Sequence, residues 1–189
     1  MDQSLFYWEF KDIERSSKGG GQLASFILAS CFIDALAGFY AGVFQKEITT
    51  KKQTIEKREF IINDKGEEEE SRSGKRYTTF VARYLSQYKP DNLYKDLRCG
   101  LVHAYATGQS YVFSDDTNQS LFHMDNTLDG QIILKLEDFL ADIRIAYRQY
   151  RKDIIDSNDL FIKAKRRYES MLLMGPVKII PVLSGSNNA

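Results

Sequence analysis

The sequence is poor in the residues on which most enzyme sites are built. It contains two histidines and two cysteines, and it has no HExxH, CxxC or GxSxG pattern and no glycine-rich phosphate loop. These absences exclude histidine-rich metal sites and most catalytic triads, so we expect no metal ion and no cofactor. Cys31 and Cys99 lie in apolar surroundings without a disulfide framework, which is typical of a reducing compartment and indicates a cytoplasmic protein.

The sequence also lacks an excess of charge of either sign. Its 26 basic and 26 acidic side chains give a formal net charge of zero. This balance excludes the global positive field of many nucleic-acid-binding proteins, so any anion-binding site must be local. The first residues carry no basic region ahead of an apolar run, so we expect no secretory signal.

One long apolar stretch, residues 23–44, is long enough to cross a membrane. Asp34 lies near its centre, where an aspartate costs about 2.5–3.5 kcal/mol on membrane-insertion scales. The stretch is also rich in alanine, glycine and serine, which allow other helices to approach closely. We therefore predict the central helix of a bundle without membrane contact, and a membrane span is the less favoured alternative.

Other helices are predicted where apolar side chains recur every three or four residues. They cover residues 5–14, 77–88, 93–106, 136–155 and 158–173. Asp91 is the predicted N-terminal cap of the helix over residues 93–106. The pattern indicates one mainly α domain over residues 1–189.

Three segments interrupt the helical pattern. Residues 45–76 form a charged insertion, either a solvated loop or a hairpin that turns at residues 63–66. Residues 109–134 alternate short apolar runs with turn residues, which predicts a small β-hairpin. His123 lies on a predicted strand there, and we interpret it as a surface or hairpin residue rather than a catalyst. Residues 175–189 are predicted to form a frayed tail.

The helix over residues 93–106 contains an arginine and a histidine five residues apart. Arg98 and His103 form an R-x4-H pattern within LYKDLRCGLVHAYA. In an α-helix this spacing places them about 140° apart around the axis and about 7.5 Å apart along it, so they share no face. Two copies of the helix that meet at a two-fold axis would pool both side chains, and Gly100 would allow a close approach. The pattern therefore predicts a homodimer.

The pattern resembles the R-x4-6-H motif of the HEPN superfamily, whose members include ribonuclease toxins, antiviral nucleases and non-catalytic nucleotide-binding bundles. The similarity extends over residues 22–150 and includes the order of elements: a long apolar helix, a second helix and then the motif helix. It implies an up-and-down bundle of about four or five helices, with the β-hairpin inserted after the motif helix, that dimerises with both motifs at the interface. The residue after the arginine is commonly polar in active members, often asparagine, whereas Cys99 stands here.

The resemblance implies metal-independent RNA cleavage, in which a ribose 2′-hydroxyl attacks the adjacent phosphate and leaves a cyclic phosphate end. His103 would transfer protons near neutral pH, and Arg98 would donate hydrogen bonds to the phosphate. The residues expected to support this pair are Asp34, Tyr94, Cys99 and Tyr105. Further RNA contacts are expected from a basic group made of Arg144, Arg148, Arg151 and Lys152.

The same residues also allow structural interpretations. Arg98 can pair with Asp34, because a buried acid needs a partner, and His103 can be a core histidine. The basic group can equally be the solvated face of a helix. Three functions therefore stay open: a HEPN-like ribonuclease of toxin or phage-defence type, a non-catalytic bundle that binds a nucleotide or RNA, and a dimeric interaction protein in which the motif is structural.

Overall fold

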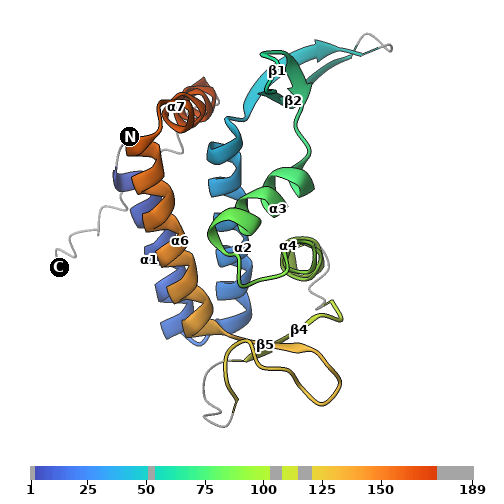
Figure 1. The fold of residues 1–189 in the computed structure, drawn as a ribbon, viewed down its shortest axis with the longest axis vertical. Helices are drawn as coiled ribbons and strands as arrows, with labels where there is room; N and C mark the ends of the chain where they lie inside the picture. The colour runs from blue at the N-terminus through green and yellow to red at the C-terminus, as the bar shows by residue number, and fades with distance from the viewer. Residues whose placement is uncertain (1–2, 51–53, 103–107, 115–120, 174–189) are drawn as a thin grey trace, which may run out of the picture.

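Long helices make up most of the protein, and two small sheets lie at opposite sides of them (Figure 1). The computed structural model describes residues 3–50, 54–102, 108–114 and 121–173. The predicted mainly α class is confirmed. The helical elements are α1 (Gln3–Lys18), α2 (Gln22–Ala41), α3 (Ser73–Tyr84), α4 (Pro90–Leu93), the π-helical segment η1 (Tyr94–Leu101), α6 (Leu136–Asp156) and α7 (Asn158–Leu173).

Helix α2 is apolar on all sides and contacts α1, α3, η1, α6 and α7. It is long and apolar enough to cross a membrane, but 56% of that stretch is buried inside the protein, as in a core helix, so its composition is weak support for a membrane span. The helix ends at Gly42, whose φ of +67° suits glycine. A Cβ atom there would lie 2.9 Å from the Cβ of Lys163. Glycine therefore permits both the end of α2 and the close approach of α7.

The helices on either side of α2 follow the prediction with one extension. Helix α1 runs to Lys18 rather than to residue 14, because the chain leaves the helix only at the glycine run over residues 19–21. Helices α6 and α7 have nearly the predicted bounds. The buried side chains of α6 are those at the predicted helical spacing: Leu136, Phe139, Leu140, Ile143, Ala146 and Tyr150.

The charged insertion is a three-stranded antiparallel sheet that projects beyond the helices (Figure 1). Its strands are β1 (Phe44–Thr49), β2 (Ile55–Ile62) and β3 (Glu68–Glu70), in the order β1-β2-β3. Phe60 of β2 pairs with Phe44 on one side and Glu70 on the other. The predicted turn is confirmed, since the Gly66 N–H donates to the carbonyl of Asn63 at 2.9 Å. Strand β1 was not predicted, because its alternating charges resemble a loop.

The second sheet corrects the hairpin predicted for residues 109–134. Strands β4 (Tyr111–Ser114) and β5 (Ile132–Lys135) pair in parallel. The turn residues that suggested a hairpin lie between the strands, where Asn126 forms an antiparallel bridge to Ile132 around a turn at residues 127–130. Parallel strands can be joined only by a crossover connection that returns the chain to the end of the sheet where the first strand began. Such a connection needs about a dozen residues or more, whereas a hairpin turn joins antiparallel strands.

The segment that leads into the motif also differs from the prediction. Helix α3 begins and ends earlier than residues 77–88. Asp91 does not cap the next helix, because Pro90 occupies its first turn and the cap position is Lys89, without a side-chain bond. Proline suits this place because its missing N–H would have no partner there. The helix predicted over residues 93–106 is present through Val102; its last residues and the tail at residues 175–189 lie outside the described residues.

Candidate functional site

The motif begins on a π-helical turn that is anchored in the core. In η1 the side chains of Leu97 and Leu101 are fully buried and Asp96 is 4% exposed. With its i→i+5 hydrogen bonds, a π-helix holds more residues per turn than an α-helix, so the 140° offset expected from α-helical geometry does not hold within η1. Turns of this kind are frequent at functional sites. His103 and Tyr105 lie outside the described residues.

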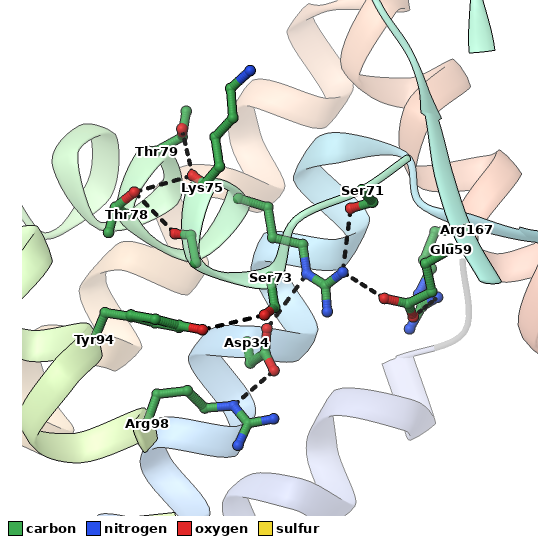
Figure 2. Close-up of polar contacts among 12 residues, drawn as sticks. Asp34, Glu59, Ser71, Ser73, Lys75, Thr78, Thr79, Tyr94, Arg98 and Arg167 are labelled. Atoms are coloured by element: carbon green, nitrogen blue, oxygen red, sulfur yellow. Dashed lines mark hydrogen bonds and ion pairs between the residues drawn. The ribbon is translucent and has the colours of Figure 1, made fainter. Parts of the chain in front are cut away.

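Arg98 is held by Asp34 of the central helix. Its Nε donates to Asp34 Oδ2 at 2.9 Å, which confirms the pair expected from the sequence. Burial disfavours the charged guanidinium, but the hydrogen bond and the charge of Asp34 oppose it, and the pKa of Arg98 is raised. Nε is the guanidinium nitrogen that the dashed line joins to Asp34 (Figure 2). Asp34 therefore pairs with the charge of the arginine and sets the orientation of its guanidinium.

Asp34 also belongs to a larger set of charges, here called the ion-pair network. Arg76 Nε lies 3.5 Å from Asp34 Oδ1, and Arg76 Nη1 donates to Glu59 Oε2 at 2.5 Å. The same glutamate accepts a hydrogen bond from Arg167 Nη1 at 3.3 Å. The network thus joins η1, α2, α3, β2 and α7 (Figure 2). Its members are Arg98, Asp34, Arg76, Glu59 and Arg167.

The network is only partly exposed to solvent, but it is not fully hydrogen-bonded. The side chains of Arg76 and Arg167 are 11% and 15% exposed. Among the described residues, Arg76 Nε, Arg167 Nε and Asp34 Oδ1 are buried atoms without a hydrogen-bond partner. The Arg76 Nε to Asp34 Oδ1 distance of 3.5 Å is an ion pair but too long for a good hydrogen bond. A buried polar atom without a partner costs about 1–3 kcal/mol, so these atoms reduce what the network contributes to stability.

Tyr94 and Cys99 lie on the same helical segment as Arg98. The Tyr94 hydroxyl lies 3.2 Å from that of Ser73, and its ring packs against Tyr77 with centroids 5.4 Å apart. Burial raises the pKa of Tyr77. Cys99 is partly exposed. Tyr94 therefore fixes the motif segment to the start of α3, and the structure brings it together with Asp34 and Arg98 as expected.

The basic group expected to contact RNA lies on α6, away from Arg98. Figure 1 places α6 and the α4 segment that leads into η1 on opposite sides of α2. Arg144 donates to Glu14 at 3.0 Å and so ties α6 to α1. The Arg151 guanidinium lies over the Tyr147 ring, 5.7 Å from its centroid. Arg148, Arg151 and Lys152 are exposed and form a separate basic surface.

His123 lies in the turn region before β5 rather than on a strand. Its Nδ1 accepts the backbone N–H of Lys135 at 3.0 Å, and its Nε2 lies 2.9 Å from the Tyr88 hydroxyl. Tyr88 in turn donates to Asp142 Oδ2 at 2.5 Å. His123 therefore links this turn region to α6.

Sequence reasoning did not find Arg76, Glu59 and Arg167, which lie far apart in the chain. The one signal in the sequence for a second basic partner is Asp34 itself, because a buried aspartate can pair with more than one basic side chain. Among the described residues, no group of three or more His, Cys, Asp or Glu side chains is placed to hold a metal ion. Comparisons with protein-family models, with curated proteins and with solved structures gave no match.

Proposed function

We propose that the protein is a HEPN-like helical domain that cleaves RNA without a metal ion, using Arg98 and His103. The observation that carries this proposal is the guanidinium of Arg98, held through Nε by Asp34 at 2.9 Å on a π-helical turn. Donors whose orientation is fixed in advance stabilise charge that develops on a phosphate, because they need no rearrangement during the reaction. The R-x4-H spacing and the mainly α fold support the same proposal.

In this mechanism each side chain has one role. Arg98 donates hydrogen bonds to the phosphate oxygens as their charge grows, while the ribose 2′-hydroxyl attacks the phosphorus. His103 exchanges protons with the attacking or leaving oxygen, which suits a side chain that titrates near neutral pH. The exposed Arg148, Arg151 and Lys152 contact the RNA backbone at a distance from the cut. Two copies contribute to the site as a homodimer, and the reaction takes place in the cytoplasm.

A second candidate is a non-catalytic bundle that binds a nucleotide or an RNA end through Arg98. Two observations favour it. Asp34 offsets much of the charge that Arg98 would offer to a phosphate, and Cys99 stands where active relatives of the motif commonly carry a polar residue.

The test uses purified wild type, Arg98→Ala and His103→Ala with mixed RNA and a metal chelator. We expect the wild type to leave cyclic phosphate ends and each variant to lose about 100-fold or more in rate. Lys95→Ala, an exposed change on the same segment, is the matched control. Melting temperatures identify any variant that fails to fold.

Three other outcomes are informative. RNA binding without cleavage, weakened by Arg98→Ala, would support the second candidate. Neither binding nor cleavage by the wild type would reject both candidates. A monomer in light scattering at micromolar concentration would contradict the homodimer.

A further inference from the structure

A cleft opens where the three-stranded sheet joins the helices. Its volume is about 360 Å³, and residues of β2, β3, α3, α7 and the end of α2 line it. This lies near the lower limit of ligand sites, about 300–1,000 Å³, and suits a ligand the size of one nucleotide. Arg76 is the one member of the ion-pair network that lines the cleft.

One wall of the cleft is basic. Arg72, Lys75 and Arg76 come from the start of α3, and Lys163 comes from α7. Arg72 has no ion-pair partner among the described residues, and both it and Lys75 are exposed. Helix α3 has no side-chain cap and no acid in its first turn. Its N-terminal end therefore adds partial positive charge to that of the side chains, and this wall suits a phosphate group.

The other walls differ in chemistry. Asp64, Glu69 and Glu70 supply carboxylates, while Tyr40, Ile61 and Ile62 supply apolar surface. Lys75 lies 3.9 Å from Glu69, and Lys163 lies 2.8 Å from Asp159, so the basic wall is partly offset. With four basic and three acidic side chains, the cleft does not suit several phosphates inside it. It suits one with a single anionic end and a flat ring that carries N–H donors.

We propose that this cleft binds one nucleotide unit, with the phosphate on Arg72, Lys75 and Arg76 and the base near Tyr40 and Ile61. The cleft is joined to the motif, since Arg76 lies 3.5 Å from Asp34 and Asp34 holds Arg98 at 2.9 Å. The nucleotide is either free or part of an RNA strand whose neighbouring phosphate lies at Arg98. Only the strand form rests on the function proposed above.

The test measures binding of AMP and of a six-residue oligoadenylate by titration calorimetry at fixed salt. Arg72→Glu/Lys75→Glu reverses the basic wall at two exposed positions. Arg15→Glu/Lys18→Glu makes the same charge change at the end of α1, on the side of the molecule opposite the sheet (Figure 1). We expect wild type and this control to bind alike, and the cleft variant to bind about tenfold or more weakly. Melting temperatures of both variants check the fold.

Each outcome decides the inference. If the wild type binds AMP and the cleft variant does not, the result supports a free nucleotide as the ligand. If the wild type binds only the oligoadenylate and the cleft variant does not, the result supports an RNA strand. The proposal is overturned if the cleft variant and the control bind both probes with equal affinity. It is also overturned if the wild type binds neither probe. Arg98→Ala separates the proposals, since AMP binding that survives in it supports the cleft even if the protein cleaves no RNA. Cleavage that is unchanged in the cleft variant leaves the proposed function intact while contradicting the strand form.

Discussion

Two polar regions hold the protein together in different ways. On the side of the three-stranded sheet, the ion-pair network joins five elements through full charges, and three of its buried atoms have no hydrogen-bond partner among the described residues. On the side of β4 and β5, neutral donors meet carboxylates and a histidine at 2.5 to 3.1 Å. The first region holds paired charges beside a cleft, and the second uses its polar groups to fix the backbone. We therefore expect the largest single loss of stability from a change in the second region.

The largest effect is expected at Asp96. Its carboxylate accepts the N–H groups of Ser110 and Tyr111 at 2.9 and 3.1 Å and is nearly inaccessible to solvent. Asp96→Ala leaves two buried donors without a partner and should lower the free energy of unfolding by about 3 kcal/mol, measured by urea denaturation. Gly108→Ala should act in the same direction, because a Cβ atom there would lie 1.7 Å from Asp96 Oδ1.

The control for this variant is Asp91→Ala, an exposed acid near the start of the same helical segment. Its effect should stay within about 0.5 kcal/mol. Equal stabilities of the Asp96 and Asp91 variants would contradict the stabilising role of the Asp96 carboxylate.

The next effect is expected at Asp34. Asp34→Asn leaves Arg98 and Arg76 without a counter-charge and should cost about 2 kcal/mol, less than a fully enclosed pair because the side chains are partly exposed. Arg98→Met should cost less, since Asp34 keeps Arg76. Thermal unfolding of both variants compares their two losses of stability. Lost stability without any change in RNA or nucleotide binding would show that the Asp34 pair is structural alone.

A smaller effect, with a defined pH dependence, is expected at Tyr88. Burial and the bond to Asp142 raise the pKa of Tyr88, so the fold needs the neutral hydroxyl. This contribution is present below about pH 10, the ordinary tyrosine pKa, and is lost as the pH rises further. Tyr88→Phe should cost about 1.5 kcal/mol at pH 7, and its difference from wild type should narrow above pH 10. A constant difference from pH 8 to pH 11 would be inconsistent with this role.

The smallest effect is expected at His123. His123→Ala removes the acceptor for the Lys135 N–H and should cost about 1 kcal/mol. His123→Asn should recover part of this loss, because its amide oxygen can accept the same hydrogen bond. Denaturant midpoints of the three proteins give the comparison, and an asparagine variant no more stable than the alanine variant would argue against the bond.

The sequence was sufficient where the signal is local. Helices α6 and α7 follow from apolar spacing, and the turn after β2 follows from asparagine and glycine at residues 63 and 66. The pairing of Asp34 with Arg98 followed from one rule, that a buried acid needs a cation.

The sequence was insufficient where distant segments decide the structure. The parallel direction of β4 and β5 depends on the path of the chain between them, while the turn residues alone suggest a hairpin. Glu59 joins the network only because β2 lies beside α3 and α7. The π-helical register of η1 has no apolar period of its own, since the leucines at 93, 97 and 101 fit an α-helix equally well.

That register makes the length of the motif segment as important as its composition. A π-helical turn holds one residue more than an α-helical turn, so η1 can present both Asp96 and Leu101 to the interior although they are five positions apart. A deletion of one residue between them would shift the phase of the helix and carry Arg98 around the axis relative to Asp34, even if all the side chains of the pair were kept. In chains that share this motif, a gap of one residue at this place would therefore be a more severe change than most substitutions.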